Sequence, residues 1–304
     1  MKASGIVLFV LITGISQAQQ SIPLEGRWDL TIEWNNQQVP SWLEVRHSGR
    51  ETLIGRFVFA FGSARPVAEV KWDHGRFRFS IPPQWEPGTR EMEFEGTLTD
   101  HALTGTMIYT DGKTYPFTGT RAPSLLREGK INWGKPVTLI GKDLSGWKAT
   151  GKNQWTVENG VLKSLESGSN LMTEQTFTDF KLHVEFRYPA GSNSGVYLRG
   201  RYEVQINDAA GLEPWDIHFS SIYGFLPPHR NVARAAGEWQ SYDITLVGRT
   251  VTVVANGVTV ISEQVIPGIT GGAIDSQEGT PGPILLQGDH GPIEFRNMII
   301  RPRL

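Results

Sequence analysis

The chain contains no cysteine, and its charges are nearly balanced, with 29 Lys and Arg against 31 Asp and Glu and a formal net charge of −2. Without cysteine no disulfide can form, which excludes the small disulfide-rich scaffolds. Without a basic excess or a basic stripe, the chain lacks the electrostatic pattern of a nucleic-acid-binding protein. Its 304 residues, 39% of them hydrophobic and 20% charged, describe a globular chain with room for one large domain or two ordinary ones.

Glycine, proline and tryptophan are abundant in contrast, with 34, 18 and 10 residues. Glycine and proline mark turns, whereas large aromatic side chains fill sheet faces or stack on flat ligands. This composition predicts many short strands joined by turns.

The N-terminus has the pattern of an export signal. Lys2 precedes an apolar stretch over residues 6–15, and Ser16-Gln17-Ala18 places small residues at the two positions that a signal peptidase reads. The stretch is shorter than the roughly 20 residues needed to span a bilayer. We therefore predict a cleaved signal peptide at residues 1–18, no membrane span, and a periplasmic or secreted protein. The absence of cysteine suits an oxidising compartment.

Residues 21–122 read as a small all-β domain. Apolar and polar residues alternate over 28–34, 76–81 and 91–95, which is typical of half-buried antiparallel strands. Turn signals such as Asp73-His74-Gly75 and Asp111-Gly112 separate such runs. The pattern predicts a small β-barrel or sandwich, and its solvent-facing positions show no set of residues that would carry chemistry. The alternation ends in a polar, turn-rich segment, which we interpret as a linker over residues 123–134.

Residues 135–304 have the same all-β character with sharper signals. Asn256-Gly257 lies between two β-branched runs, and Asn159-Gly160 is a second hairpin signal of this kind. A domain of about 170 residues with hairpins and no long helix has to bury its strands sheet against sheet. The sequence predicts a jelly-roll β-sandwich.

Two strand patterns in this half place polar side chains on one face. Residues 180–187 and 201–207 alternate without a fault, and the second run puts Glu203 and Gln205 among its polar positions. Such a face is either an ordinary solvated surface with cross-strand ion pairs or a sugar-binding surface, because amides and charged groups supply the donors and acceptors that hydroxyls require.

The segment 211–237 is too long for a hairpin connection and is rich in aromatic residues and histidines. Long loops in compact domains are often binding loops, although a loop folded over a sheet edge is an equal alternative here. It contains His218, Tyr223 and Arg234.

Familiar catalytic motifs are missing. There is no His-Glu-x-x-His, phosphate loop or Gly-x-Ser-x-Gly sequence. Glu203 and Asp208 would lie roughly 16 Å apart along a continuous strand, whereas a retaining glycosidase needs about 5.5 Å between its carboxylates. These two residues are therefore not a glycosidase pair unless the chain turns between them.

Several motifs in the second half resemble, in order, those of the 3-keto-disaccharide hydrolase family, a family of concanavalin-like β-sandwiches distantly similar in fold to family 16 glycoside hydrolases. The resemblance covers about residues 135–304, and Arg234 stands where the family prefers lysine. The motifs are Leu139-Ile140-Gly141-Lys142-Asp143-Leu144-Ser145-Gly146-Trp147, Asn193-Ser194-Gly195-Val196-Tyr197-Leu198-Arg199-Gly200, Tyr202-Glu203-Val204-Gln205-Ile206, Ile222-Tyr223-Gly224, Ala236-Gly237-Glu238-Trp239-Gln240 and Pro281-Gly282-Pro283-Ile284-Leu285-Leu286-Gln287 with Phe295-Arg296-Asn297.

The resemblance implies a small carbohydrate substrate, a glycoside whose C3 hydroxyl a separate dehydrogenase has already oxidised to a ketone. The ketone acidifies the C2 proton, so elimination across C1–C2 followed by hydration cleaves the bond with one base, an electrophile for the enolate oxygen and a proton donor. The implied catalytic residues are Glu203 as base and His290 or His218 as proton carriers. The implied substrate-binding residues are Arg199 at the enolate oxygen, Gln205 and Gln287 at hydroxyls, Trp239 as a stacking surface, and Asp208, Tyr223 and Arg234.

Two alternatives stay open. The sequence requires no cofactor, but a divalent cation held by Glu203, Asp208 or His290 is an alternative electrophile. The alternative to an enzyme is a carbohydrate-binding protein on the same sandwich without turnover.

Overall fold

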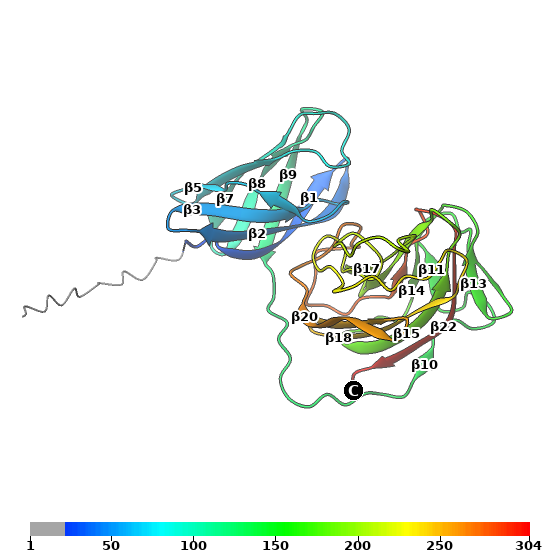
Figure 1. The fold of residues 1–304 in the computed structure, drawn as a ribbon. Coiled ribbons are helices and arrows are strands. Elements are labelled where there is room, and N and C mark those ends of the chain that lie inside the picture. Colours follow the sequence, from blue (N-terminus) through cyan, green and yellow to red (C-terminus); the bar gives the residue numbers. More distant parts are fainter. Residues whose placement is uncertain (1–21) are drawn as a thin grey trace, which may run out of the picture.

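The computed structural model describes residues 22–304, so the predicted signal peptide lies outside the described residues. Within this range the chain forms strands and loops but no helix, and hence no helix that could cross a membrane. The strands form one large sheet from the first part of the chain and two sheets from the second (Figure 1).

The first part is a single antiparallel sheet of nine strands in the order β4-β3-β2-β1-β9-β8-β7-β6-β5. It curls until β4 approaches β6, and it therefore takes the barrel form of the two expected architectures. Its strands are β1 (Gly26–Trp34), β2 (Gln37–Ser48), β3 (Thr52–Val58), β4 (Arg65–Val67), β5 (Lys71–Asp73), β6 (Arg76–Ile81), β7 (Met92–Thr99), β8 (Ala102–Ile108) and β9 (Thr114–Arg121).

The alternation in the sequence explains the core of this sheet. Phe77, Phe79 and Ile81 on β6 are buried, while the residues between them are exposed. Phe79 stacks on Phe94 of β7 with ring centroids 4.6 Å apart. The concave side of the curled sheet is thus filled by aromatic side chains, whose large apolar area stabilises a sheet that has no second layer of its own.

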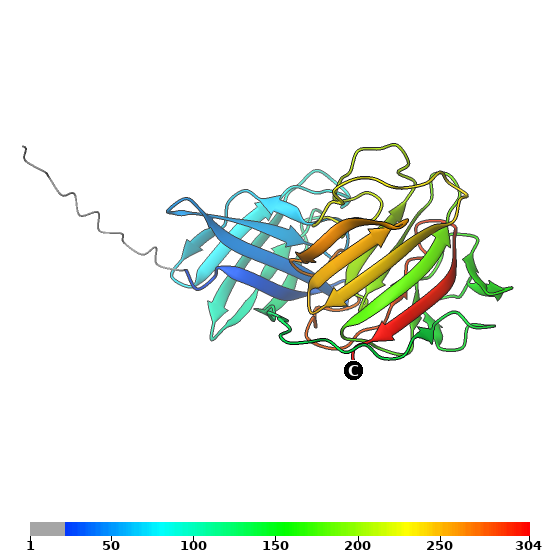
Figure 2. The ribbon, with the colours of Figure 1, turned by 60° about the horizontal axis from the view of Figure 1, so that its bottom comes forward.

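The second part is a two-sheet sandwich (Figure 2). The larger sheet has the order β12-β13-β22-β15-β18-β19-β20 with β10 beside β22, and the smaller has the order β11-β14-β21-β16-β17. The strands are β10 (Val137–Thr138), β11 (Trp147–Ala149), β12 (Thr156–Glu158), β13 (Val161–Ser164), β14 (Leu171–Thr173), β15 (Phe180–Arg187), β16 (Asn193–Leu198), β17 (Tyr202–Asn207), β18 (Gln240–Val247), β19 (Thr250–Ala255), β20 (Val258–Val265), β21 (Leu285–Leu286) and β22 (Ile293–Pro302).

The expected all-β fold, a small curled sheet followed by a jelly-roll sandwich, is confirmed. Asn256 and Gly257 have φ of 50° and 78° and join β19 to β20, as a hairpin turn with two left-handed residues requires. Between the first sheet and β10 the chain follows an extended course around the sandwich without forming a strand (Figure 1), where the linker was expected. Independent folding of the two parts stays a prediction.

One expectation about the strands, the exposure of the polar positions of 201–207, is wrong. The runs 180–187 and 201–207 lie in different sheets, β15 in the larger and β17 in the smaller. β15 alternates between buried and partly exposed residues as expected, whereas on β17 the polar Glu203 and Gln205 are also buried, with 3% of each exposed. The face that alternation alone assigns to solvent is covered by other parts of the chain.

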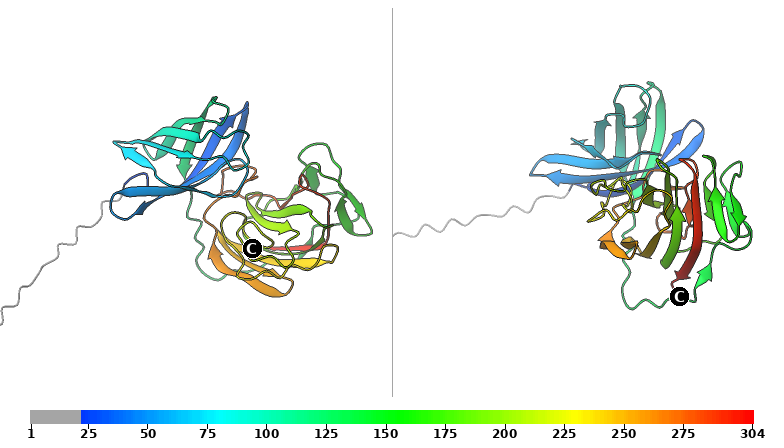
Figure 3. Two further views of the ribbon diagram at one scale, coloured as in Figure 1. Left: turned by 45° about the horizontal axis from the view of Figure 1, so that its top comes forward. Right: turned by 45° about the vertical axis from the view of Figure 1, so that its right-hand side comes forward.

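The first sheet lies beside the sandwich (Figure 3). The contact between the two parts is closely packed. Trp42 of β2 belongs to the core of the sandwich, and its ring meets that of Phe225 edge to face at 5.2 Å. Gly268 leaves no space for a Cβ beside the Trp42 indole, and a Cβ on Gly224 would lie 2.6 Å from the backbone nitrogen of Ala64. These contacts orient the two parts relative to each other.

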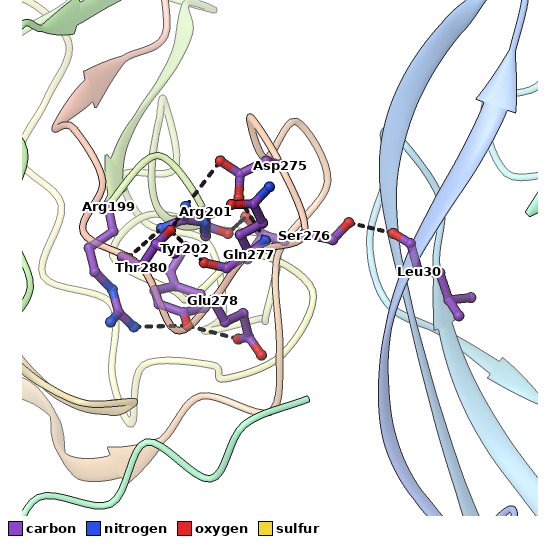
Figure 4. Close-up of polar contacts among 10 residues, drawn as sticks. Leu30, Arg199, Arg201, Tyr202, Asp275, Ser276, Gln277, Glu278 and Thr280 are labelled. Atoms are coloured by element: carbon purple, nitrogen blue, oxygen red, sulfur yellow. Dashed lines mark hydrogen bonds and ion pairs between the residues drawn. The ribbon is translucent and has the colours of Figure 1, made fainter. Parts of the chain in front are cut away.

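A buried polar network lies at the same interface (Figure 4). Tyr202 donates to Glu278 at 2.7 Å, Arg249 lies 3.5 Å from the other oxygen of Glu278, and Ser276 donates to the carbonyl of Leu30 in the first sheet. The carboxyl of Asp29, next to Leu30, faces that of Glu278 within hydrogen-bonding reach. Two buried carboxyls at this separation cannot both be ionised without a large cost, so one holds a proton.

This pair predicts a pH-dependent stability. Burial, with the neighbouring charge of Glu278, raises the pKa of Asp29 from 3.8 to about 9. At neutral pH the folded protein therefore keeps a proton that the unfolded chain has released, and the stabilisation present in acid is lost as the pH rises towards 9. Asp29→Asn, which keeps a hydrogen-bond donor towards Glu278, should raise the melting temperature at pH 9 by several degrees and change it little at pH 4–5.

Thermal unfolding at pH 4.5 and pH 9 measures this difference. Asp100→Asn, at an exposed turn of the first sheet, is the control and should shift neither value. Equal shifts of Asp29→Asn at both pH values would contradict the assignment.

Candidate functional site

A pocket of about 260 Å³ opens between the smaller sheet of the sandwich and the loop that follows β3 in the first sheet. Several buried or half-buried polar side chains of β16, β17 and the neighbouring loops face it. Its lining residues are Ala60, Phe61, Gly62, Asn170, Asn193, Tyr197, Glu203, Gln205, Tyr223, Gly271, Gly272, Gln287, Asp289 and His290.

The register between β16 and β17 brings three pocket side chains, those of Tyr197, Glu203 and Gln205, onto one face. Tyr197 pairs with Glu203 and Gly195 pairs with Gln205, and residues two apart along a strand share a face. The alternate positions, such as Val196 and Val204, point into the sandwich core. The polar half of the pattern is therefore directed at the pocket.

Both carboxyl oxygens of Glu203 are held. The hydroxyl of Tyr197 lies 2.9 Å from Oε2 of Glu203 and 3.0 Å from the carbonyl oxygen of Gly271. With its amide nitrogen directed towards Glu203, Gln205 donates to Oε1 at 3.2 Å and to the carbonyl of Ser194 at 3.2 Å. These contacts fix the orientation of the carboxyl group in the pocket.

Gly195 provides the space that Glu203 occupies. A Cβ at this position would lie 2.9 Å from Cδ of Glu203 and closer still to Oε1. The backbone of Gly195 does not require glycine for its conformation, since its φ is outside the left-handed region. The glycine of the Asn-Ser-Gly-Val-Tyr motif is therefore explained by the close approach of the Glu203 side chain.

Burial raises the pKa of Glu203 from 4.5 to about 8, against the opposing effects of the Tyr197 hydrogen bond and the charge of His290. The carboxyl is consequently protonated in most molecules at neutral pH. The single Tyr197 proton faces two oxygens, so when it goes to the Gly271 carbonyl, the Tyr197 oxygen can accept the proton of Glu203. Once ionised, Glu203 is a much stronger base than an exposed carboxylate.

His290 lies at the open side of the pocket with 52% of its side chain exposed. Its Nδ1 lies 2.6 Å from Oδ1 of Asp289. This hydrogen bond, with the charges of Asp289 and Glu203, raises the pKa of His290 above 6.5 against the effect of partial burial. The pocket thus combines a buried carboxyl with an imidazole that tends to carry a proton.

Two amide oxygens of the pocket lining have no hydrogen-bond partner among residues 22–304. They are Oε1 of Gln287 and Oδ1 of Asn193, which accept no hydrogen bond from the described residues. Gln287 is only 7% exposed. The backbone of Gln287 is fixed by bonds to Gly195 and Ser194. Buried acceptors without a donor carry a free-energy cost that a ligand with hydroxyl groups would remove.

Tyr223 adds a hydroxyl from the long loop. Burial and the nearby Glu203 raise its pKa to about 12, while a hydrogen bond with Trp85 of the first sheet lowers it. Because an indole N–H only donates, Trp85 acts as the donor in its interaction with the Tyr223 oxygen. Tyr223 is thus a neutral donor at physiological pH.

A known family, described as the 3-keto-alpha-glucoside-1,2-lyase-like domain, matches residues 135–301, more than half of the chain. The chain belongs to this family. A 3-keto-disaccharide hydrolase of Bacteroides thetaiotaomicron is 26% identical, with 38% of this chain and 53% of that protein covered, so the chain spans about half the length of this relative.

Two solved structures of candidate glycosyl hydrolases from Parabacteroides distasonis are also similar. One is 31% identical over 58% of this chain and 92% of that chain, with a TM-score of 0.48. The other is 26% identical over 56% of this chain and 100% of that chain, with a TM-score of 0.45.

The pocket contains five of the residues that the family resemblance implied for the site. They are Glu203, Gln205, Tyr223, Gln287 and His290. Their placement is consistent with the expected roles, which stay predictions.

Arg199 is not among them, and its expected place at an enolate oxygen requires correction. It lies in the turn between β16 and β17 with φ of 54°, is fully buried, and donates to the Tyr202 hydroxyl and the Gly248 carbonyl, both at 2.9 Å. Its side chain belongs to the interface network of Figure 4, beside Tyr202. Tyr202 packs in the core of the sandwich, on the opposite face of β17 from Glu203. Strand alternation would place Arg199 on the same face as Tyr197. The turn directs its guanidinium to the other face instead, which the alternation pattern alone could not predict.

Trp239 and Arg234 also lie outside the pocket lining. The Trp239 ring is covered by the guanidinium groups of Arg187 and Arg296, at 4.8 and 3.8 Å from its centroid, on the outer face of the larger sheet. Arg234 is exposed and donates to the Trp239 carbonyl at 2.9 Å. Trp239 is therefore a cation–π partner here rather than a stacking surface of the pocket.

His218 and Asp208 have local structural partners instead. Nδ1 of His218 lies 3.0 Å from the Glu213 carbonyl in the long loop, and Asp208 accepts from the Gly191 amide at 2.9 Å. Since Asp208 is turned away in this manner, it does not join Glu203 and His290 in a ligand set. Among residues 22–304 no group of three or more His, Asp or Glu is arranged to hold a metal ion.

The sequence interpretation missed several pocket residues. Asn193 and Tyr197 belong to the motif at residues 193–200, and their positions opposite β17 could have indicated that they lie near Glu203. Nothing in the sequence indicated that residues 60–62 of the first sheet reach the pocket, where Gly272 donates to the Ala60 carbonyl at 2.9 Å. Residues 60–62 therefore add to the lining of the pocket, while the expectation that residues 21–122 carry no chemistry stays a prediction.

Proposed function

We propose that this protein cleaves the glycosidic bond of 3-keto-glycosides by elimination across C1–C2 followed by hydration. The observation that carries the proposal is the buried Glu203 carboxyl, held at both oxygens inside a small polar pocket with its pKa raised to about 8. A base of this strength suits removal of a proton next to a ketone, because the ideal catalytic pKa lies near the working pH. The family membership supports the same chemistry.

In the first step, ionised Glu203 takes the C2 proton, and the C2–H electron pair forms the C2=C3 bond of an enolate. The enolate then re-forms the C3 ketone, a C1=C2 double bond appears, and the C1–oxygen bond breaks. The leaving oxygen takes a proton from His290. Water then adds its hydroxyl to C1 and gives its other proton to His290, while C2 recovers a proton from Glu203, so both residues return to their starting states and the net reaction is hydrolysis.

The remaining pocket groups serve binding and charge stabilisation. Tyr223 keeps its proton at physiological pH and directs it to the enolate oxygen, the role first expected of Arg199. The unpartnered oxygens of Gln287 and Asn193 accept from sugar hydroxyls. Each of these donors and acceptors is in place before substrate binds, which lowers the reorganisation cost of the reaction.

The proposal extends to the substrate supply and the location of the protein. A 3-keto-glycoside requires a separate dehydrogenase that oxidises the C3 hydroxyl. The signal pattern of residues 1–18 favours a periplasmic or secreted protein.

Incubation with a 3-keto aryl glucoside should release the aglycone, and kcat/KM should rise with pH up to about 8 because Glu203 acts in its ionised form. The unoxidised aryl glucoside is the control and should give no release, since its C2 proton is not acidic. A protein that binds the 3-keto substrate without any release would instead be the carbohydrate-binding alternative. A rate that falls steadily between pH 6 and 8 would contradict Glu203 as the base.

A further inference from the structure

Trp85 is one of the few large apolar side chains that the described residues leave in solvent, with 66% of it exposed. It lies in the loop between β6 and β7 of the first sheet. Trp215, 60% exposed, is the other tryptophan of residues 22–304 that stays largely in solvent, whereas most aromatic side chains pack in two cores. The position of Trp85 relative to the pocket indicates a reason for its exposure.

The indole lies at the rim of the pocket. Gly62 lines the pocket, and a Cβ on Gly62 would lie 3.1 Å from Cδ1 of Trp85. The indole N–H, next to Cδ1 in the ring, interacts with the hydroxyl of Tyr223 and lowers its pKa, and Tyr223 also lines the pocket. Trp85 is therefore adjacent to two lining residues, one from each part of the chain, while most of its surface stays free.

The loop that carries Trp85 is held rigidly. Glu86 accepts two hydrogen bonds from Arg65, at 3.2 and 2.8 Å, and both side chains are buried. Glu86 also accepts from the backbone amides of Gln84 and Trp85, and Gln84 bonds to Ser63. A fixed aromatic ring is a preorganised surface, because little conformational freedom is lost when a ligand binds to it.

The pocket is small for a disaccharide. Its volume of about 260 Å³ lies below the roughly 300–1,000 Å³ of pockets that enclose drug-sized ligands. One sugar ring suits it, with C2 directed at Glu203. The group that leaves from C1 then has to extend through the opening past the rim.

We infer that Trp85 is the binding surface for the leaving group, a second sugar or an aromatic aglycone that stacks on the indole while the 3-keto sugar fills the pocket. This inference rests on the proposed function. It makes the first sheet part of substrate recognition, because the sheet supplies a surface that residues 135–301 lack.

The test compares a substrate with a large leaving group, 3-keto-trehalose, and one with a small leaving group, methyl 3-keto-glucoside. For Trp85→Ala we expect KM for 3-keto-trehalose to rise about 5- to 20-fold with little change in kcat, and KM for the methyl glycoside to stay nearly constant. Trp85→Phe keeps a ring but removes the N–H to Tyr223, and should retain most of the affinity. Melting temperatures establish that the variants fold.

Trp133→Ala is the matched control. Trp133 pairs with Arg303 at the end of β22 remote from His290, so its loss should leave both KM values unchanged. Equal effects of Trp85→Ala on both substrates, or an effect no larger than that of Trp133→Ala, would overturn the inference.

Calorimetric binding of unoxidised trehalose and methyl glucoside separates this inference from the proposed function. If trehalose binds more tightly and Trp85→Ala removes the difference, the leaving-group surface stands even for a protein that releases no aglycone. If neither sugar binds or Trp85→Ala leaves the difference intact, the surface is rejected, whatever the turnover shows.

Discussion

Glu203→Gln is expected to lower kcat on a 3-keto-glycoside by about 100- to 10,000-fold, the usual cost of losing a general base. Glutamine keeps the size of the side chain and one oxygen, so the contacts with Tyr197 and Gln205 survive in part while the basic group is lost. Binding of product should remain close to that of the natural protein. The rise of kcat/KM towards pH 8 should disappear together with the rate.

Glu185→Gln is the control for this variant. Glu185 also lies on a strand of the sandwich, but on the outer face of the larger sheet, where it accepts from Arg296 at 2.6 Å and Asn297 at 2.8 Å. Its exchange should leave kcat unchanged and alter stability by about 0–1 kcal/mol. A normal rate for Glu203→Gln would reject Glu203 as the base and pass that role to His290.

Gly195→Ala is expected to lower kcat by about 100-fold without any change to a titratable group. The added methyl group would occupy the space of the Glu203 carboxyl, and the neighbouring strand backbone cannot move aside readily. A displacement of the base by about 1 Å is enough for a loss of this size. Gly195 acts through Glu203 and is a positioning residue.

Two comparisons distinguish displacement of Glu203 from general damage. Gly141→Ala adds a methyl group where no atom lies within 4 Å and the backbone φ is ordinary, so it should leave the rate unchanged. In the Glu203→Gln background, where the base is already missing, Gly195→Ala should cost little additional rate. Full additivity of the effects of the two substitutions on the rate would contradict the positioning role. In the single variant Gly195→Ala, which keeps the titrating carboxyl, the apparent pKa of the pH–rate profile should shift.

The strands themselves follow closely from the sequence. The alternation over 76–81 and 180–187 and the Asn-Gly turns at 159–160 and 256–257 determine local geometry, because side-chain direction in a strand has period two and left-handed turns require these residues. The same reasoning separates the polar from the apolar positions of β17. It therefore identifies Glu203 and Gln205 as facing away from the core, as they do.

Burial of that polar face could not be inferred in this way. Whether Glu203 meets water or a closed pocket depends on the loop 211–237 and on residues 60–62, which are distant in sequence and arrive only when the sheets pack. The raised pKa of Glu203 results from this burial. An identical strand on an open sheet would carry an ordinary carboxylate.

The sequence by itself determined the all-β class, the two successive parts and, through ordered motifs, the residues from which the site is drawn. Only the tertiary structure decided which of them meet. Arg199 stands four residues before Glu203, yet its side chain points into the interface network. Gln287 and Asp289 follow Glu203 by more than 80 residues, yet they line the same pocket as Glu203. The reason is physical: strand period fixes the face on which a side chain lies, but sheet order and the docking of the first sheet fix its neighbours.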